Sequence, residues 1–273
     1  MVFVAFRIPG SYGGVEPLIV KGASSGHITI NMSLDSIKFA LSSKFIWQLF
    51  LRSMVYSIIT TLCCLGLSYP LAMMVAKSNK KYRDILLLLV IIPFWSCFLI
   101  RVYAWMIILG PQSAVNHAIN YLIESFGFAA VNLLYSPVAV IICLVYINLP
   151  FMILPLYANL EKHDEALIEA SRDLGASRWQ SFWKITLPLS MPGILAGGAL
   201  VFIPSIGMFV VPELVGNNCS LMIGNLIKQQ FLQTMNWPLG SVTAIVMTVS
   251  VLAISALVGV IASRTGGLRY ANK

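Results

Sequence analysis

The sequence has little charge for its length. Only 10% of its 273 residues are Asp, Glu, Lys or Arg, whereas a soluble domain carries about 25%. Hydrophobic residues make up 58% of the chain, the mean hydropathy is +0.85, and the apolar residues gather in long blocks. These properties exclude a soluble globular domain and predict an all-α integral membrane protein, most of which is solvated by lipid.

Motifs for nucleotide, metal and nucleic-acid binding are also lacking. The chain has no G-x-x-x-x-G-K-[ST] loop, so it does not itself hold the phosphates of ATP, and no cofactor is expected here. The cysteines lack metal-ligand spacing, and His163-Asp164-Glu165 points to different faces of a helix, so we expect neither a metal site nor catalytic residues. The net charge of +8 comes from basic residues in short loops, which indicates membrane topology and argues against binding of nucleic acid.

A membrane-embedded enzyme is an alternative function for such a chain. An enzyme of this kind needs clustered His, Asp, Glu or Cys at membrane depth, and the apolar blocks have almost none.

Five apolar segments are long enough to cross a bilayer, which takes about 20 helical residues. They are Ser53–Val75, Ile85–Leu109, Pro137–Tyr157, Ser190–Val211 and Gly240–Ala262. We therefore predict one transmembrane domain over 53–262, an N-terminal segment 1–52 and a short tail 263–273.

Basic residues in the short loops predict the orientation, because cytoplasmic loops are enriched in Lys and Arg. Loops 76–84 and 158–189 carry four basic residues each, whereas loop 110–136 has none and loop 212–239 has only Lys228. We expect the first two loops and the C-terminal tail on the cytoplasmic side.

The N-terminal segment does not contain a complete span. Its first residues, MVFVAF, are too short to cross a bilayer and lack the basic start and full apolar core of a signal peptide. Residues 7–52 would then lie outside, although they carry five basic residues, which is contrary to the charge rule. One interpretation is that MVFVAF is the end of a first span whose beginning is missing, followed by an external segment.

Loop 158–189 predicts two short helices joined by a glycine. The first, Glu161–Leu174, is rich in helix formers and ends at Gly175, the residue that most readily adopts the left-handed cap. Ser177 can cap the second helix, and Pro188 is expected to end it. The large apolar residues that share a face of the second helix are Trp179, Phe182 and Ile185. An exposed apolar face in a cytoplasmic loop is typical of a surface that docks on another protein, which an inert anchoring protein does not need.

This loop resembles the EAA loop of ABC importer permeases. The family pattern is E-A-A, three residues, Gly, nine residues and I-x-L-P, and Ser171 replaces its third small residue. The matching positions are Glu169, Ala170, Ser171, Gly175, Ile185, Leu187 and Pro188. The resemblance implies a type I permease bundle whose helix–Gly–helix loop inserts into a cytoplasmic ATPase subunit and transmits its closure to the spans. The alternative is a helical hairpin that packs on the membrane surface.

The resemblance extends to the polyamine (spermidine/putrescine) branch over roughly residues 33–262, and within it to the permease in the role of first subunit. It is carried by IIPFWSCFLIRVYAW at 91–105, LPFMILPLYANLEK at 149–162, LPLSMPGILAG at 187–197, VPELVGNN at 211–218 and NWP at 236–238. That family has six spans, so the sixth, N-terminal one is truncated or missing here. The resemblance implies a second permease subunit, an external solute-binding protein, a small cationic substrate and the bacterial inner membrane as the location. Importers of ferric iron, thiamine or a phosphonate remain alternatives.

Charges and aromatic rings near the outer ends of the spans are candidates for the transport path, because charge at membrane depth is costly. Arg101 lies sixteen residues from the inner end of Ile85–Leu109, about 24 Å along a straight helix. Glu213 follows Pro212 at the outer end of Ser190–Val211, where a carboxylate suits an amine. The rings that could add cation–π contacts are Trp95, Tyr103, Tyr146 and Trp237. The structural alternatives are snorkelling or an ion pair for Arg101, an interfacial carboxylate for Glu213, and packing or interface anchoring for the rings.

Overall fold

The computed structural model describes residues 1–10, 13–16, 19–21, 28–30, 33–125, 132–217 and 220–267. Within these residues the regular structure is helical except for one antiparallel pair of strands, β1 (Ile19–Lys21) and β2 (Ile28–Ile30). The predicted all-α fold is confirmed for the spans, and the small sheet in the N-terminal segment is an exception that the sequence analysis did not anticipate.

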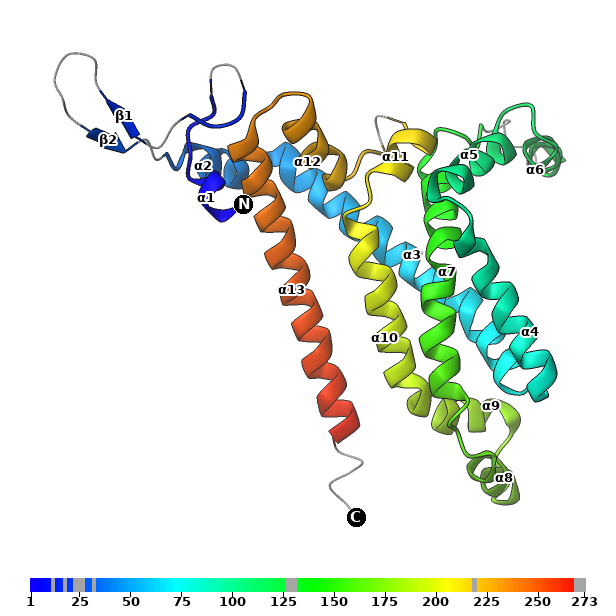
Figure 1. Cartoon of the computed structure of the whole chain (residues 1–273). Helices are drawn as coiled ribbons and strands as arrows, with labels where there is room; N and C mark the ends of the chain where they lie inside the picture. The colour runs from blue at the N-terminus through cyan, green and yellow to red at the C-terminus, as the bar shows by residue number, and fades with distance from the viewer. Residues whose placement is uncertain are drawn as a thin grey trace.

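Four helices are long and apolar enough to cross a membrane, and they confirm four of the five predicted spans. They are α3 (Lys44–Ala76), α7 (Pro137–Leu160), the continuous helix Arg178–Ile206, and the part of α13 (Trp237–Gly267) up to Ala256. The first of them begins nine residues before the predicted Ser53 and is 33 residues long, about 50 Å at 1.5 Å per residue. This length exceeds the hydrocarbon core of about 30 Å, and α3 accordingly runs obliquely behind α10 and α7 (Figure 1).

The fifth predicted span, Ile85–Leu109, is not a single straight helix. It consists of α4 (Lys80–Ile91), the 3-10 turn η1 (Ile92–Trp95) and α5 (Phe98–Leu109), with a bend of 93° between the two halves. Pro93 has no amide hydrogen to donate and Ser96 is extended, so the helical hydrogen bonding stops there. The placement of Arg101 about 24 Å along a straight helix is therefore wrong, because Arg101 lies beyond the bend.

The centre of the bundle is α7, which packs on both α3 and α10 (Leu187–Ile206). Small residues make this packing close: on α3 the buried ones are Ser53, Ser57, Thr60, Cys64, Ser68 and Ala72. On α10, a Cβ added at Gly193 would lie 2.7 Å from the Cβ of Asn159, and one at Gly197 would lie 2.7 Å from the sulfur of Met152. Membrane helices associate through such close packing, and Gly193 and Gly197 have the G-x-x-x-G spacing that permits it.

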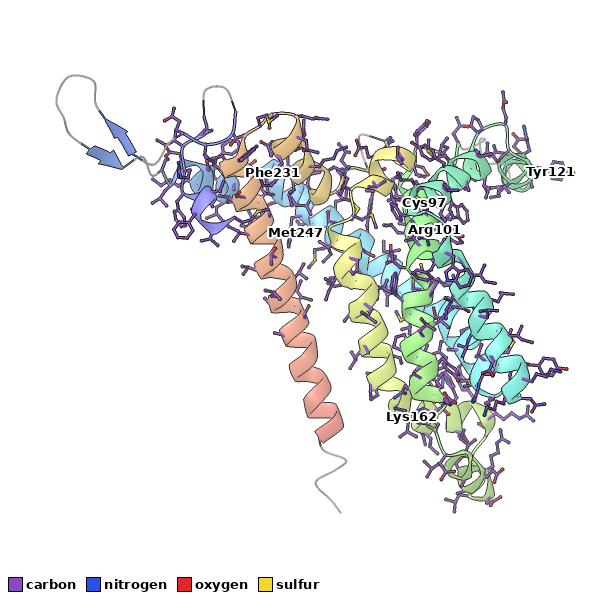
Figure 2. The ribbon with its side chains drawn as sticks, in the orientation of Figure 1. Cys97, Arg101, Tyr121, Lys162, Phe231 and Met247 are labelled. Carbon is purple, nitrogen blue, oxygen red and sulfur yellow. The ribbon has the colours of Figure 1, made fainter. Side chains whose placement is uncertain are left out.

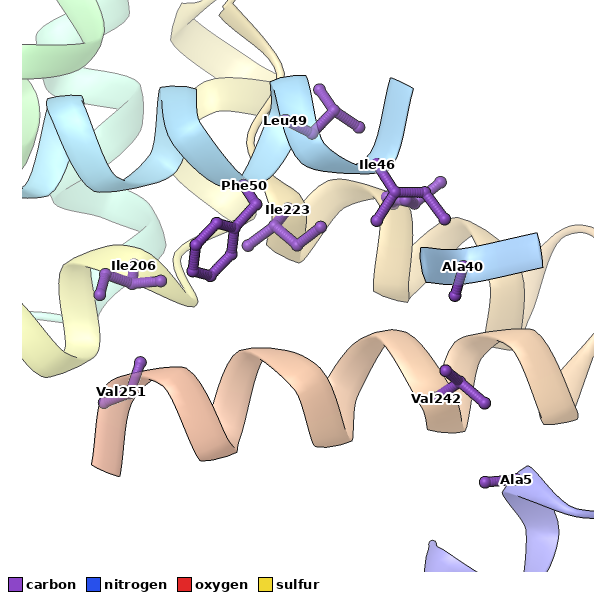
Figure 3. Packing of buried hydrophobic residues seen from close by; sticks show 10 residues of the cluster. Ala5, Ala40, Ile46, Leu49, Phe50, Ile206, Ile223, Val242 and Val251 are labelled. Carbon is purple, nitrogen blue, oxygen red and sulfur yellow. The ribbon is translucent and has the colours of Figure 1, made fainter. Parts of the chain in front are cut away.

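The N-terminal elements lie at the end of the bundle that also holds α5, α6 (Ala114–Ser125), α11 (Val210–Val215) and α12 (Ile223–Leu232) (Figure 1). The segment MVFVAF forms the short helix α1 (Val2–Ala5), which packs on α13, as does α2 (Asp35–Ser42). One apolar cluster joins these elements to α3 and α12 (Figure 3); it includes Ala5, Ala40, Ile46, Phe50, Ile223 and Val242. This cluster holds α1 and α2 against α3 and α13 at this end of the bundle.

The opposite end of the bundle holds α8 (Glu165–Asp173), α9 (Arg178–Ser181), the start of α4 and the end of α13 (Figure 1). An ion pair of 2.6 Å between Arg83 and Glu161 joins the start of α4 to the end of α7. The loops that were predicted to be cytoplasmic thus share one end of the molecule, as the charge rule requires. Of the predicted tail 263–273, residues 268–273 lie outside the described residues.

Candidate functional site

The loop between α7 and α10 has the predicted helix–Gly–helix structure. The first helix, α8, begins only at Glu165, because the Oδ1 atom of Asp164 accepts a hydrogen bond of 3.0 Å from the amide of Ala166 and caps it. Gly175 follows the end of this helix with a φ of +84°, in the left-handed region that glycine enters without strain. The predicted role of Gly175 as the turn residue is confirmed, and the predicted start of the helix at Glu161 is wrong by four residues.

The second helix has the predicted cap at Ser177. The amide of Gln180 donates to Ser177 Oγ at 3.2 Å, and the amide of Ser177 donates to Gln180 Oε1 at 2.9 Å, which is a capping box. However, Pro188 does not end this helix: α9 continues through a π turn, Phe182–Thr186, into α10. The wider π turn directly before Pro188 accommodates its ring, so the chain stays helical from the loop into the span.

A buried hydrogen bond locks the two helices of the loop together. The Oγ atoms of Ser171 and Ser181 lie 2.7 Å apart, and each hydroxyl also reaches a carbonyl of its own helix, that of Ile168 at 2.7 Å and that of Ser177 at 3.2 Å. Ser171 therefore does more than provide a small residue, because it fastens α8 to α9. The sequence analysis missed Ser181, since a lone serine ten residues downstream carries no signal without the fold of the hairpin.

One face of the loop is exposed and apolar. Leu174 is 89% exposed and Trp179 is 69% exposed. The Trp179 ring stacks on Phe182 with centroids 5.8 Å apart, which holds it in place. Of the other motif positions, Glu169 and Ala170 are exposed, whereas Ile185, Leu187 and Pro188 are half-buried where the loop meets the spans. The first part of the motif, Glu169 and Ala170, is thus accessible to a partner protein. The last part, from Ile185 to Pro188, packs where the loop joins the helix bundle.

The residues predicted for the transport path are not gathered into one site. The Arg101 guanidinium lies over the rings of Phe94 and Phe98, at 5.6 and 6.0 Å, close to the bend (Figure 2). The Tyr146 ring packs on Trp105 with centroids 5.4 Å apart. The remaining rings are exposed ones: Trp95, Tyr103 and Trp237. In the described part of the chain, no hydrogen bond, ion pair or ring contact joins any two of the six predicted path residues.

Glu213 does not lie at the end of a straight span as predicted. The helix α10 ends at Ile206, and Glu213 lies on the separate helix α11. Its two carboxylate oxygens accept hydrogen bonds of 2.5 and 2.7 Å from the Nζ atom of Lys228. The same Nζ atom is 5.7 Å from the ring centroid of Phe209. The sequence analysis missed Lys228 as the partner of this carboxylate and Phe209 as the ring beside the ammonium, although the four-residue spacing of Phe209 and Glu213 was an available signal.

The sequence of the membrane domain matches a known family. Residues 68–267 match the model of the family described as "Binding-protein-dependent transport system inner membrane component". The chain belongs to this family.

Curated relatives agree with this membership, and solved structures of transporters share the fold. The chain is 45% identical over 203 residues to the spermidine/putrescine transport system permease protein PotB of Escherichia coli (strain K12), covering 74% of this chain and 73% of the relative. It is 47% identical over 204 residues to PotB of Haemophilus influenzae, covering 74% and 70%. A bacterial alginate ABC transporter in complex with its loaded periplasmic protein has a similar fold, with a TM-score of 0.61, 21% identity and coverage of 85% and 83%. The inward-facing methionine ABC transporter MetNI also has a similar fold, with a TM-score of 0.59 and 19% identity. The match covers 82% of this chain and 99% of the MetNI chain.

The chain is therefore a multi-pass inner-membrane permease of a transport system and not an enzyme. Such a system also includes a binding protein and an ATPase.

Proposed function

We propose that this chain is the permease subunit through which spermidine and putrescine cross the bacterial inner membrane, driven by ATP hydrolysis in a separate subunit. The observation that carries the proposal is the 45–47% identity, over about three quarters of the chain, to permeases named for spermidine and putrescine transport. A second permease subunit completes the channel, and a binding protein delivers the amine to its outer face.

Loop 158–189, which contains α8 and α9 and is called the coupling loop below, supplies the mechanical connection to the ATPase. The exposed side chains of Leu174 and Trp179 insert into the ATPase, and the bond between Ser171 and Ser181 makes the two loop helices move together. Because the second loop helix continues into the span, Arg178–Ile206 is one continuous helix of 29 residues, about 43 Å long. Closure of the ATPase therefore displaces the span directly, and the π turn Phe182–Thr186 is the natural point for bending.

The orientation follows from the same proposal and predicts the readout of reporter fusions. A reporter fused after Lys81 or after Lys184 should read as cytoplasmic. A reporter fused after Ala130, which lies outside the described residues, should read as external. Phosphatase and fluorescent-protein fusions measure this directly, and an inverted pattern would contradict both the charge rule and the docking of the loop on an ATPase.

Transport itself is tested with the reconstituted system. We expect proteoliposomes with the two permeases, the ATPase and the binding protein to take up labelled spermidine and putrescine only when ATP is supplied. Each amine should compete with the other, while ferric iron, thiamine and phosphonates should not compete. Uptake of one of these three solutes without uptake of amines would overturn the substrate assignment and leave the family membership intact.

A further inference from the structure

The side chain of Lys228 occupies a place whose chemistry suits a substrate amine. Its ammonium group is held by both oxygens of Glu213, at 2.5 and 2.7 Å, and lies 5.7 Å from the centroid of the Phe209 ring. A carboxylate and an aromatic face together are what recognise an alkylammonium ion. The ammonium of lysine ends a four-carbon stem, as each ammonium of putrescine does.

The backbone that carries Phe209 and Glu213 is held by hydrogen bonds and by buried neighbours. Phe209 is the N-cap residue of α11 and Glu213 lies one turn further on, where its amide donates to the Phe209 carbonyl at 3.2 Å. Asn225 Nδ2 donates to the same carbonyl at 2.9 Å, and Val211 and Val215 are fully buried on the other side of the helix. The side chains of Lys228 and Glu213 are 28% and 40% exposed, so water reaches the pair, and the four rotatable bonds of Lys228 let its ammonium swing out.

The ion pair also connects two separate parts of the outer end. Glu213 belongs to α11, which packs with α5 and α7 in one apolar cluster that includes Val211 and Val215. Lys228 belongs to α12, which packs with α3 and α13 in the cluster that includes Ile223 and Leu226. Release of Lys228 would therefore weaken a connection between the two clusters at the face where substrate arrives.

We propose that Phe209 and Glu213 form a binding site for a primary ammonium group, that Lys228 is its built-in occupant, and that an incoming polyamine displaces Lys228. This inference rests on the proposed function, because the ligand is the transported amine. The exchange replaces one ammonium by another, so Glu213 is never left without a cation and the cost of an unpaired carboxylate is avoided. Displacement loosens the link between α11 and α12, which makes the opening of this end dependent on substrate.

Two single substitutions separate this exchange from a structural ion pair. Labelled putrescine is equilibrated with the assembled transporter without its binding protein, and its binding is compared among variants. Lys228→Gln removes the competitor and should strengthen putrescine binding about fivefold, whereas Glu213→Gln should weaken it by a similar factor. Phe209→Leu should also weaken it, because the aromatic face is lost while the apolar volume is kept. Glu124→Gln, on the exposed surface of α6, is the control for general surface charge and should leave binding unchanged.

The signs of these effects decide the outcome. If Lys228→Gln and Glu213→Gln weaken putrescine binding alike, or leave it unchanged, the pair is structural and the exchange is refuted. Thermal stability of each purified variant shows whether a loss of binding reflects unfolding. Uptake of amines by the wild-type system is measured in parallel, so that failure of the exchange and failure of the proposed substrate are distinguished.

Discussion

Replacing Gly175 by aspartate should abolish ATP-dependent uptake while the permease stays at its normal level in the membrane. Gly175 has a φ of +84°, and a residue with a side chain costs about 1 kcal/mol or more in this conformation. A Cβ at Gly175 would meet no atom within 4 Å, so steric overlap within the chain does not contribute. The larger cost is expected on docking, because the proposed ATPase interface would desolvate the new carboxylate next to the exposed Leu174. Uptake and membrane level are measured in the same cells.

Gly175→Asn is the matched control for this prediction. Asparagine tolerates the left-handed region better than other residues with side chains, and it has the size of aspartate without the charge. It should therefore retain a substantial part of the uptake and of the ATPase binding in a pull-down experiment. Normal uptake by Gly175→Asp at normal permease levels would show that the loop does not dock as proposed.

Gly197→Val should lower the stability of the permease itself. Its Cβ would lie 2.7 Å from the sulfur of Met152, 3.2 Å from the Met152 carbonyl oxygen and 3.3 Å from the ring of Pro155. The backbone cannot yield as a flexible side chain can, so α10 and α7 have to separate. Overpacking of this kind costs about 1–3 kcal/mol. We expect a lower unfolding temperature of the purified permease and a reduced amount in the membrane.

The neighbouring glycine provides the control. A Cβ at Gly198 would have one neighbour at 3.8 Å, the Cγ2 atom of Thr61, which is ordinary van der Waals contact. Gly198→Val therefore makes the same chemical change one residue further along the same helix without a clash. If Gly197→Val and Gly198→Val lower the unfolding temperature equally, the close approach of α10 to α7 is not what holds these helices together.

The sequence alone determined the class of protein, four of the spans and the helix–Gly–helix form of loop 158–189, but not where the two loop helices begin and end. Long apolar blocks have only one stable form in lipid, because each backbone amide has to be hydrogen-bonded within its own segment. Gly175 and Ser177 were equally predictable, since a left-handed turn and a helix cap depend on residues close together in the chain. The G-x-x-x-G spacing of Gly193 and Gly197 is also present in the sequence and indicates a close helix contact.

Only the tertiary structure decided the features that depend on partners far apart in the chain. The hydropathy of Ile85–Leu109 is that of a complete span, and its 93° bend arises where Pro93 and Ser96 interrupt the hydrogen bonds and the bundle holds α5 on α11. The pairing of Glu213 with Lys228 joins residues fifteen positions apart on two different helices. Apolar periodicity reports which segments are buried in lipid or protein, but it contains no information about which side chains meet, because that depends on how the helices are turned and packed.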